Sequence, residues 1–300
     1  RPTGNKLLEY VRGAAMPYPS GAAQAELFDT VLGVAIDRYN RLWTIDHGNH
    51  GMRTARIVAI DLDTNEILRN QALSPDIAPA GSFLQDLQVS ADGNTVVIAD
   101  ASFWRKSPAI IVYDVETGEA RRVLESHASV SAENYVIRSG DREMKFFGGV
   151  VALRGGVDGI ALGPEWLYYG ALSGSGLYRV LLKDLLDESL PPSQLANRVE
   201  RIGDKPLSDG LSIDIEGNIY ITDVEHGSIF VTGAGKNLKT LIQAPDLRWP
   251  DALSFGPDGY LYIADSALAE LILQSREHIE AQGPYRIFRL QPGVDGVPGQ

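Results

Sequence analysis

Alternating apolar and polar positions recur along the chain in a repeated phrase of two short strands joined by a polar turn. Each phrase runs from one apolar strand through a turn such as Asp92-Gly93 to a second apolar strand, which ends in aspartate. An Asp-Gly or Glu-Gly pair between alternating strands is typical of a tight hairpin. The phrase occurs at VLGVAIDRYNRLWTID (31–46), LQDLQVSADGNTVVIAD (84–100), LSDGLSIDIEGNIYITD (207–223) and WPDALSFGPDGYLYIAD (249–265), with a degenerate copy at GVDGIALGPEWLYYGALS (156–173).

Two further strands follow most copies of this phrase. The third strand is predicted at 55–62, 109–115, 176–182, 227–233 and 285–290, and the fourth at 67–73, 120–125, 199–203 and 239–243. Four-stranded antiparallel units at this period are the signature of an all-β propeller. One more strand, LLEYV (7–11), is interpreted as the remains of a sixth unit. We therefore predict a single domain over 1–300, a six-bladed β-propeller whose first blade begins before Arg1.

The connectivity of a propeller decides which residues share a face. Strands alternate in direction, so the start of each innermost strand and the end of the second strand meet at one mouth of the central channel. The long connections fall on the same side, with a hairpin predicted at 135–146 and helices at 181–189 and 268–282. An elaborated face on a plain scaffold is where a binding site is expected.

Four acids stand at equivalent positions of four blades, where the innermost strands begin. They are Asp86, Asp158, Asp209 and Asp251, and Gly33 takes the position in the remaining blade. Converging carboxylates repel one another unless a cation lies among them or some take up protons. Oxygen-only ligands suit Ca²⁺, Mg²⁺ or Mn²⁺, so we predict a divalent cation here. The alternative is that these acids only bond backbone amides and water in a wet channel.

A second set of aspartates ends the second strands and is expected to be structural. Carboxylates at strand ends accept hydrogen bonds from the amides of the adjoining loop. These residues are Asp46, Asp100, Asp223 and Asp265.

Rim loops carry the other candidate groups. His47 and His50 in TIDHGNHGMR (44–53), and His226 at the matching place in another blade, could act as a general base or bind a ligand. Phe103, Trp104 and Trp249 could wall a pocket for a flat ligand or an amine. For each, a bystander or packing role is the alternative, and Trp43 and Trp166 are expected in the core.

Composition removes several classes of function. With no cysteine, the chain forms no disulfide, zinc–thiolate site or cysteine nucleophile. A net charge of −12 disfavours nucleic acid and anionic membranes, and no apolar run reaches membrane-spanning length. A small cationic or neutral molecule is the expected partner, while the oligomeric state is left open. Because the chain begins at Arg1 rather than methionine, we expect that residues upstream were removed by processing, were cut away with a tag, or lie outside the given chain. A soluble protein in a secreted or periplasmic location is favoured.

Several stretches resemble the Yellow/major royal jelly protein family, particularly its bacterial members. They are LWTIDHG (42–48), FLQDLQVSADGNTVVIADAS (83–102), IIVYDVETGEARRVL (110–124) and VDGIALGPEWLYYGALSGSGLYRV (157–180), within a similarity that spans most of 28–292. The resemblance implies a six-bladed propeller. Insect members include amine-binding and dopachrome-converting proteins, so it implies no single activity.

A more distant resemblance is to the SMP-30/gluconolactonase group, whose members bind an axial divalent cation and hydrolyse lactones. Their ligands are a Glu, two Asn and an Asp. The resemblance places the Asp at Asp209 in DGLSIDIEG (209–217) and the two Asn at Asp158 and Asp86, while the Glu has no visible counterpart. An Asn-to-Asp change keeps an oxygen ligand but adds negative charge, which favours cation binding more than lactonase activity.

Together these observations predict a cation-dependent hydrolase of a lactone or ester at the channel mouth. Asp158, Asp209 or His47 would then be the base. Two alternatives stay open. In one, the chain is a binding protein whose acids meet an ammonium group while an aromatic side chain stacks on the ligand. In the other, it is a dopachrome-type tautomerase that uses a rim histidine.

Overall fold

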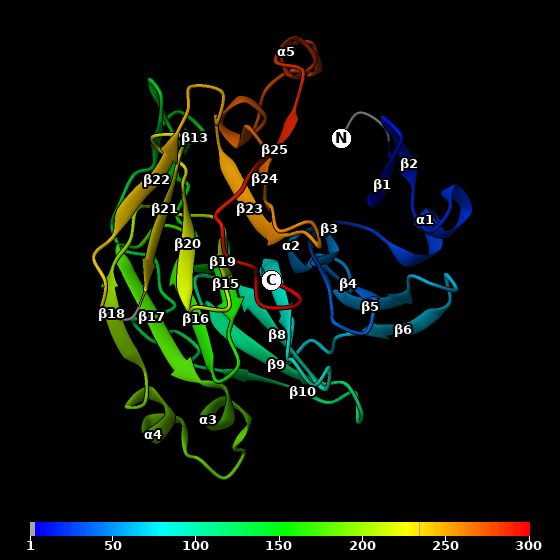
Figure 1. Ribbon diagram of the computed structural model, residues 1–300, viewed down its shortest axis with the longest axis vertical. Helices are drawn as coiled ribbons and strands as arrows, with labels where there is room; N and C mark the ends of the chain where they lie inside the picture. Colours follow the sequence, from blue (N-terminus) through cyan, green and yellow to red (C-terminus); the bar gives the residue numbers. More distant parts are fainter. Residues whose placement is uncertain (1–3, 234) are drawn as a thin grey trace.

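Five antiparallel sheets stand in a ring around a central axis (Figure 1). The structure is a computed structural model that describes residues 4–233 and 235–300. The predicted all-β propeller is therefore confirmed. The blades, each paired in chain order from the axis outward, are β3 (Val31–Ile36), β4 (Arg41–Asp46), β5 (Arg56–Asp61) and β6 (Ile67–Ala72); β7 (Leu84–Val89), β8 (Thr95–Asp100), β9 (Ala109–Asp114) and β10 (Ala120–Val123); β15 (Val157–Leu162), β16 (Trp166–Ala171), β17 (Gly176–Leu181) and β18 (Glu200–Asp204); β19 (Leu211–Ile213), β20 (Asn218–Asp223), β21 (Ser228–Gly233) and β22 (Lys239–Gln243); and β23 (Pro250–Phe255), β24 (Leu261–Asp265) and β25 (Arg286–Leu290).

The blade count differs from the prediction. Within the described residues there are five blades, and the fifth has three strands because the chain returns to the axis after β25. The strand predicted at 7–11 is present as β1 (Leu8–Val11), but it pairs with β2 (Ala14–Pro17) in a separate hairpin. The part of the chain predicted to begin a sixth blade is thus a two-stranded unit beside the first blade.

The insertions lie between the strands largely as predicted. The 135–146 segment contains the small hairpin β11 (Arg138–Ser139) and β12 (Arg142–Glu143), followed by β13 (Lys145–Phe146) and β14 (Val151–Ala152). The helix expected at 268–282 is split, because Leu273 adopts a positive φ between its two parts. The helical elements are α1 (Gly21–Leu27), α2 (Gly48–Gly51), α3 (Leu182–Leu186), α4 (Pro192–Ala196), η1 (Leu268–Glu270) and α5 (Arg276–Ala281). None of these, in the described ranges, is long and apolar enough to cross a membrane.

The core consists of apolar layers between neighbouring blades. Strands β8 and β9 read TVVIAD and AIIVYD, and they are buried on both faces because a blade packs against each side. Trp43 lies fully buried in the layer between the first two blades, as predicted. Trp166 is half-buried, packs against the layer between the third and fourth blades, and lies under the Arg179 guanidinium.

One blade face lacks such a neighbour. In the first blade, Leu32, Val34 and Ile36 of the innermost strand β3 are exposed, whereas Leu87 at a corresponding place in β7 is fully buried. Figure 1 shows the first and fifth blades on opposite sides of an opening in the ring, with the β1–β2 hairpin beside it. This side of β3 therefore presents the apolar surface that the other blades bury against the next blade.

The last residues of the chain cross the channel at the end opposite the predicted site. The Val297 amide donates to the Ile213 carbonyl (3.1 Å), and the Phe255 amide donates to the Gln300 carbonyl (2.7 Å). The Gln300 side chain accepts from the Leu162 amide (2.8 Å) and donates to Gln88 Oε1 (2.6 Å). Because these partners belong to four different blades, the segment ties the inner strands together and leaves the acid-bearing mouth as the free end.

Candidate functional site

A β-bulge interrupts the innermost strand in four blades at the position of the predicted site. A bulge leaves residues out of the ladder and re-aims their side chains, and it is common beside functional sites. In the fourth blade the same place is held differently, because Thr222 Oγ1 accepts from the Asp209 and Gly210 amides (both 3.0 Å). The register shifts fall between Val31 and Val34, Leu84 and Leu87, Val157 and Ile160, and Pro250 and Leu253.

Glycine after the acid lets neighbouring inner strands approach closely. A Cβ atom on Gly159 would lie 2.6 Å from the Asp209 carbonyl oxygen, and one on Gly210 would lie 2.1 Å from the Asp251 carbonyl oxygen. No side chain fits at such distances, so glycine is required. The Asp-Gly pairs at 158–159 and 209–210 therefore have a geometric reason: they bring the inner strands of the third, fourth and fifth blades close together at the acids.

We use the term acid ring for Asp86, Asp158, Asp209 and Asp251. Burial is the main cause of a raised pKa in all four, to about 7 for Asp86 and about 6 for Asp209. The pKa values of Asp158 and Asp251 lie well above the usual range, and after burial the largest cause is the negative charge of Asp209. The structure thus brings the four predicted acids into one electrostatically coupled group.

Hydrogen bonds within the acid ring show how it holds its charge. Asp158 and Asp209 lie close enough for one carboxyl group to interact with the other, which raises the pKa of Asp158 and lowers the pKa of Asp209. Asp209 Oδ2 accepts from the indole Nε1 of Trp249 (2.6 Å), and Asp86 accepts from the Ile160 amide (3.2 Å). Asp158 Oδ2 is buried and has no hydrogen-bond partner within the described residues. The ring therefore contains a buried acceptor available to a ligand.

Lys205 is a buried residue beside the acid ring that the sequence analysis missed. Only 4% of it is exposed, and its Nζ donates to the carbonyls of Ala171 (2.8 Å) and Pro206 (3.1 Å). Burial lowers the pKa of Lys205 to about 7, against the opposing pull of Asp158 and other acids. A Cβ on Gly170 would lie 2.2 Å from Lys205 Cε, so this glycine makes room for the lysine. The sequence shows Lys205 shortly before Asp209, but the other copies of the repeat have no lysine at this position. Nothing in the repeat therefore indicated that it would be buried.

Two properties of the acid ring bear on whether it can bind a metal ion: the chemistry of its donor atoms and their arrangement. Its donors are all carboxylate oxygens, which suit Ca²⁺, Mg²⁺ or Mn²⁺, and the unpartnered Asp158 oxygen suits a cation as well. In the described ranges, however, no three His, Asp or Glu side chains are arranged to hold a metal ion together. A cation would have to displace the protons that the raised pKa values of the ring acids favour and would have to turn the side chains toward itself.

The other candidates fall into a rim group and separate positions. His47 is buried, and its Nδ1 accepts from the His50 amide (2.7 Å). The rings of His47 and His50 both pack on Phe83, a residue that sequence reasoning did not single out. The remaining positions are Trp104, which is exposed beside His50; Phe103, which is buried beside Trp104; Trp249, fully buried against Asp209; and His226, exposed on the fourth blade with its ring on Asp223.

The strand-ending aspartates have the structural role predicted for them. Asp46 accepts from the amides of Thr30 and Gly48, and Asp223 accepts from the amides of Glu225 and His226. Asp265 accepts from the Trp249 amide (2.7 Å), so these bonds reach the preceding loop as well as the following one. They fasten both sides of the channel mouth to the blades.

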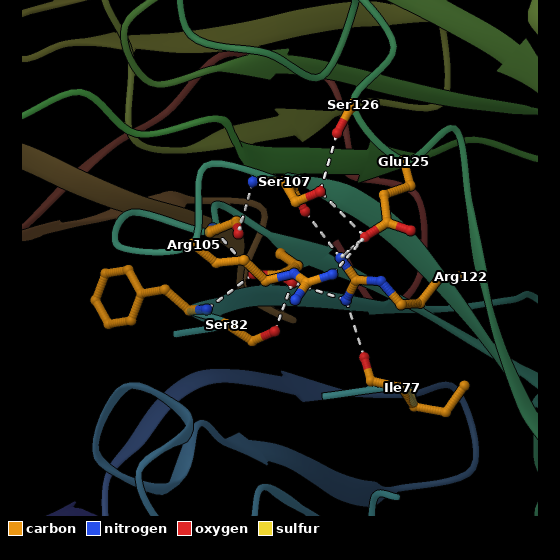
Figure 2. Close-up of polar contacts among 10 residues, drawn as sticks. Ile77, Ser82, Arg105, Ser107, Arg122, Glu125 and Ser126 are labelled. Atoms are coloured by element: carbon orange, nitrogen blue, oxygen red, sulfur yellow. Dashed lines mark hydrogen bonds and ion pairs between the residues drawn. The ribbon is translucent and has the colours of Figure 1, made fainter. Parts of the chain in front are cut away.

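Asp100 belongs to the same set but has an additional charged partner. Arg122 Nη1 donates to Asp100 Oδ2 (2.8 Å) and to the Ile77 carbonyl (2.9 Å), and Nη2 donates to the Ser107 carbonyl (2.9 Å). Figure 2 shows the Arg122 guanidinium between Ile77, Ser107 and Glu125. One buried arginine thus joins the outermost strand of the second blade to two rim loops.

Comparison with models of known protein families shows to which family the chain belongs. The sequence model described as Major royal jelly protein matches residues 29–282, most of the chain. The chain belongs to the major royal jelly protein family. No curated protein matches it closely by sequence.

Solved structures place this royal jelly family member among known propellers. It resembles a protein assigned as a gluconolactonase (TM-score 0.59, 14% identity, covering 98% of this chain and 83% of that one). It also resembles a luciferin-regenerating enzyme (0.59, 12%, 90% and 81%) and a gluconolactonase of Xanthomonas campestris (0.53, 15%, 87% and 75%). At these identities the likeness shows the fold alone. The activity of this family member has to be argued from its own residues.

Proposed function

We propose that this royal jelly family protein binds a cation at the acid ring and hydrolyses a lactone or ester at the channel mouth. The observation that carries the proposal is a charge imbalance. Four acids converge, Asp158 and Asp209 buried and Asp86 and Asp251 half-buried, while Lys205 is the one buried ammonium group among the described residues that faces them. Buried carboxylates without compensating charge are costly, so a site of this kind favours an added cation.

The roles of the chain's own residues follow from their positions. Asp86, Asp158, Asp209 and Asp251 would hold the cation, which when bound supplies Lewis-acid polarisation of a carbonyl. The Trp249 indole fixes one oxygen of Asp209 and so orients that carboxyl group. One of these aspartates, Asp158 or Asp209, would act as base toward water when it is not bound to the cation. His47 is a weaker candidate, because its Nδ1 already caps the His50 amide.

Two solved neighbours support this choice of reaction. One is named a gluconolactonase of Xanthomonas campestris, and another is a protein assigned as a gluconolactonase. Their likeness to this chain is one of fold, so they favour a reaction class without supplying its residues.

The first prediction concerns metal content. Purified protein should contain stoichiometric calcium, magnesium or manganese by elemental analysis and should hydrolyse a simple lactone such as glucono-δ-lactone. Dialysis against chelator should lower the hydrolysis rate at least tenfold, and the lost metal should restore it, because the cation polarises the carbonyl. Asp158→Asn should reduce metal content, whereas Asp76→Asn, an exposed control, should not. A metal-free protein whose lactone hydrolysis ignores chelator would exclude the proposal.

A second candidate is binding of an organic ammonium group by the same acids. It is favoured by the arrangement in the described residues, where the side chains of no three acids or histidines are oriented to hold one metal ion, and by the indole of Trp249 beside Asp209. Calorimetric titration with tyramine should then release heat that Asp209→Asn abolishes, while chelator has no effect. Absence of heat at millimolar tyramine would count against this candidate.

We also propose that the complete ring has six blades. The support is the exposed apolar face of β3, which has the character of a surface between blades, and the β1–β2 hairpin beside it. A sixth blade would cover this face and would place one more inner strand next to Gly33.

A further inference from the structure

A left-handed turn stands at the rim of the first blade. Four consecutive residues, Gly48, Asn49, His50 and Gly51, have φ between 52° and 67°. Left-handed residues normally occur singly, and a non-glycine residue there costs roughly 1–2 kcal/mol. A conformation of this kind persists only where its surroundings enforce it, and such positions cluster at functional sites. The turn is therefore a candidate ligand-binding site.

The surroundings enforce the turn through close backbone contacts. A Cβ on Gly48 would lie 2.4 Å from the Arg53 carbonyl oxygen, and one on Gly51 would lie 2.7 Å from the Pro79 carbonyl oxygen. The Gly51 amide donates to the His47 carbonyl (2.8 Å), and the Gly81 amide donates to the His50 carbonyl (3.1 Å). The turn is thus held from both sides, and the orientation of the His50 side chain is determined with it.

The turn builds one wall of an aromatic hollow. The His50 ring stacks on Phe83 (centroids 4.4 Å apart, 25° between planes) and meets the edge of Trp104 (6.4 Å, 78°). Trp104 is 51% exposed and Met52 75% exposed, and because both line the same hollow they form one small exposed apolar patch. The hollow has a volume of about 360 Å³ and is lined by Asn49, His50, Met52, Gly81 and Trp104.

The polar character of this hollow differs from that of the acid ring. None of its five lining residues, all within the described ranges, is an acid, a lysine or an arginine. Partial burial lowers the pKa of His50, which keeps its imidazole uncharged at neutral pH. Its Nδ1 atom is buried and has no hydrogen-bond partner in the described part of the chain. A charged ligand would find no compensating charge among these five lining residues, whereas a neutral one loses little on entry.

We propose that this hollow is a binding site for an uncharged, planar aromatic molecule with one hydrogen-bonding substituent, separate from the acid ring. The ring of the ligand packs on Trp104 and Met52, and the substituent bonds the His50 imidazole. Hollows of this size accept a one- or two-ring molecule. Because the site is open and has one polar contact, a small phenol binds with a Kd on the order of 1 mM.

Three phenols of matched size test the charge preference. They are p-cresol (neutral), tyramine (cationic) and 4-hydroxyphenylacetate (anionic), each titrated by saturation-transfer NMR and calorimetry into the full chain. We expect p-cresol to bind at millimolar concentration and 4-hydroxyphenylacetate to bind at least tenfold more weakly. Equal affinity for the neutral and anionic phenols would overturn the charge argument, and absence of p-cresol binding at ten times the expected Kd would overturn the site.

Variants locate the binding. Trp104→Ala should weaken p-cresol binding at least tenfold, and so should His50→Asn, which keeps the left-handed backbone because asparagine tolerates it. Tyr135→Ala removes another exposed aromatic side chain, one that does not line the hollow, and should change nothing. Asp209→Asn should leave p-cresol binding intact while removing any tyramine bound at the acid ring, so failure of this site and failure of the proposed function give different results. Unchanged p-cresol affinity in both Trp104→Ala and His50→Asn, with native circular dichroism, would show that the hollow is not the site.

Discussion

Replacement of Arg122 by methionine should lower the free energy of unfolding by about 3–5 kcal/mol, the usual cost of removing one partner of a buried ion pair. The guanidinium is 8% exposed and Asp100 is fully buried. Methionine fills much of the same volume but donates no hydrogen bond. Asp100 would then remain a buried carboxylate without its cation, and the carbonyls of Ile77 and Ser107 would lose their donors.

Equilibrium urea unfolding of the full chain measures this effect, with Arg105→Met as the matched control. Arg105 is 40% exposed, and its contact with Glu125 is long, at 3.5 Å. Exposed pairs of this kind contribute about 0–1 kcal/mol, so the control should change little. A second test is the double variant Asp100→Asn/Arg122→Met, which should recover part of the loss because the uncompensated charge is gone. Equal losses in Arg122→Met and Arg105→Met would contradict the interpretation of Figure 2 as a buried fastening.

Much of the fold could be predicted because the repeat carries its own geometry. A strand, an Asp-Gly turn and a second strand ending in aspartate, repeated at a constant period, describe a blade without any knowledge of long-range contacts. The blades themselves appear where the pattern placed them. The split of the helix expected at 268–282 was not predictable in the same way. Its apolar spacing is helical, but in the folded chain Leu273 has a positive φ and Ser275 is extended and caps the second helix.

Site residues that stand at equivalent positions of the repeated blades could be predicted, whereas site residues without a counterpart in the other blades could not. Equivalent positions in equivalent blades converge by symmetry, so Asp86, Asp158, Asp209 and Asp251 could be grouped from the sequence alone. Lys205 has no counterpart in the other blades, and its burial depends on Gly170 of a neighbouring strand. The left-handed turn likewise depends on close contacts with the carbonyl groups of Arg53 and Pro79. The sequence therefore indicated only a polar loop at this position.

The acid ring should make the protein least stable near neutral pH. The pKa of Asp209 rises from 3.8 to about 6 on folding, so between pH 4 and 6 the folded chain holds more protons than the unfolded one. Stability therefore falls as pH rises through this window. The pKa of Lys205 falls from 10.5 to about 7, so between pH 7 and 10 the unfolded chain holds more protons and stability rises with pH. The two windows meet near pH 7, where both groups oppose folding most.

Asp209→Asn should therefore stabilise the protein at pH 8, by about 1–3 kcal/mol, and should change little at pH 4. The amide carries no charge to repel Asp158 and Asp251, and its oxygen can still accept the Trp249 indole hydrogen. Urea unfolding at both pH values, with exposed Asp76→Asn as the control, measures the effect. The same variant should lose the stabilisation that a bound cation gives the parent protein, because it removes a proposed ligand. If Asp209→Asn makes the protein more stable and also lowers its cation affinity, the Asp209 carboxylate serves binding rather than folding. A loss of stability at pH 8 would instead mean that Asp209 serves the fold.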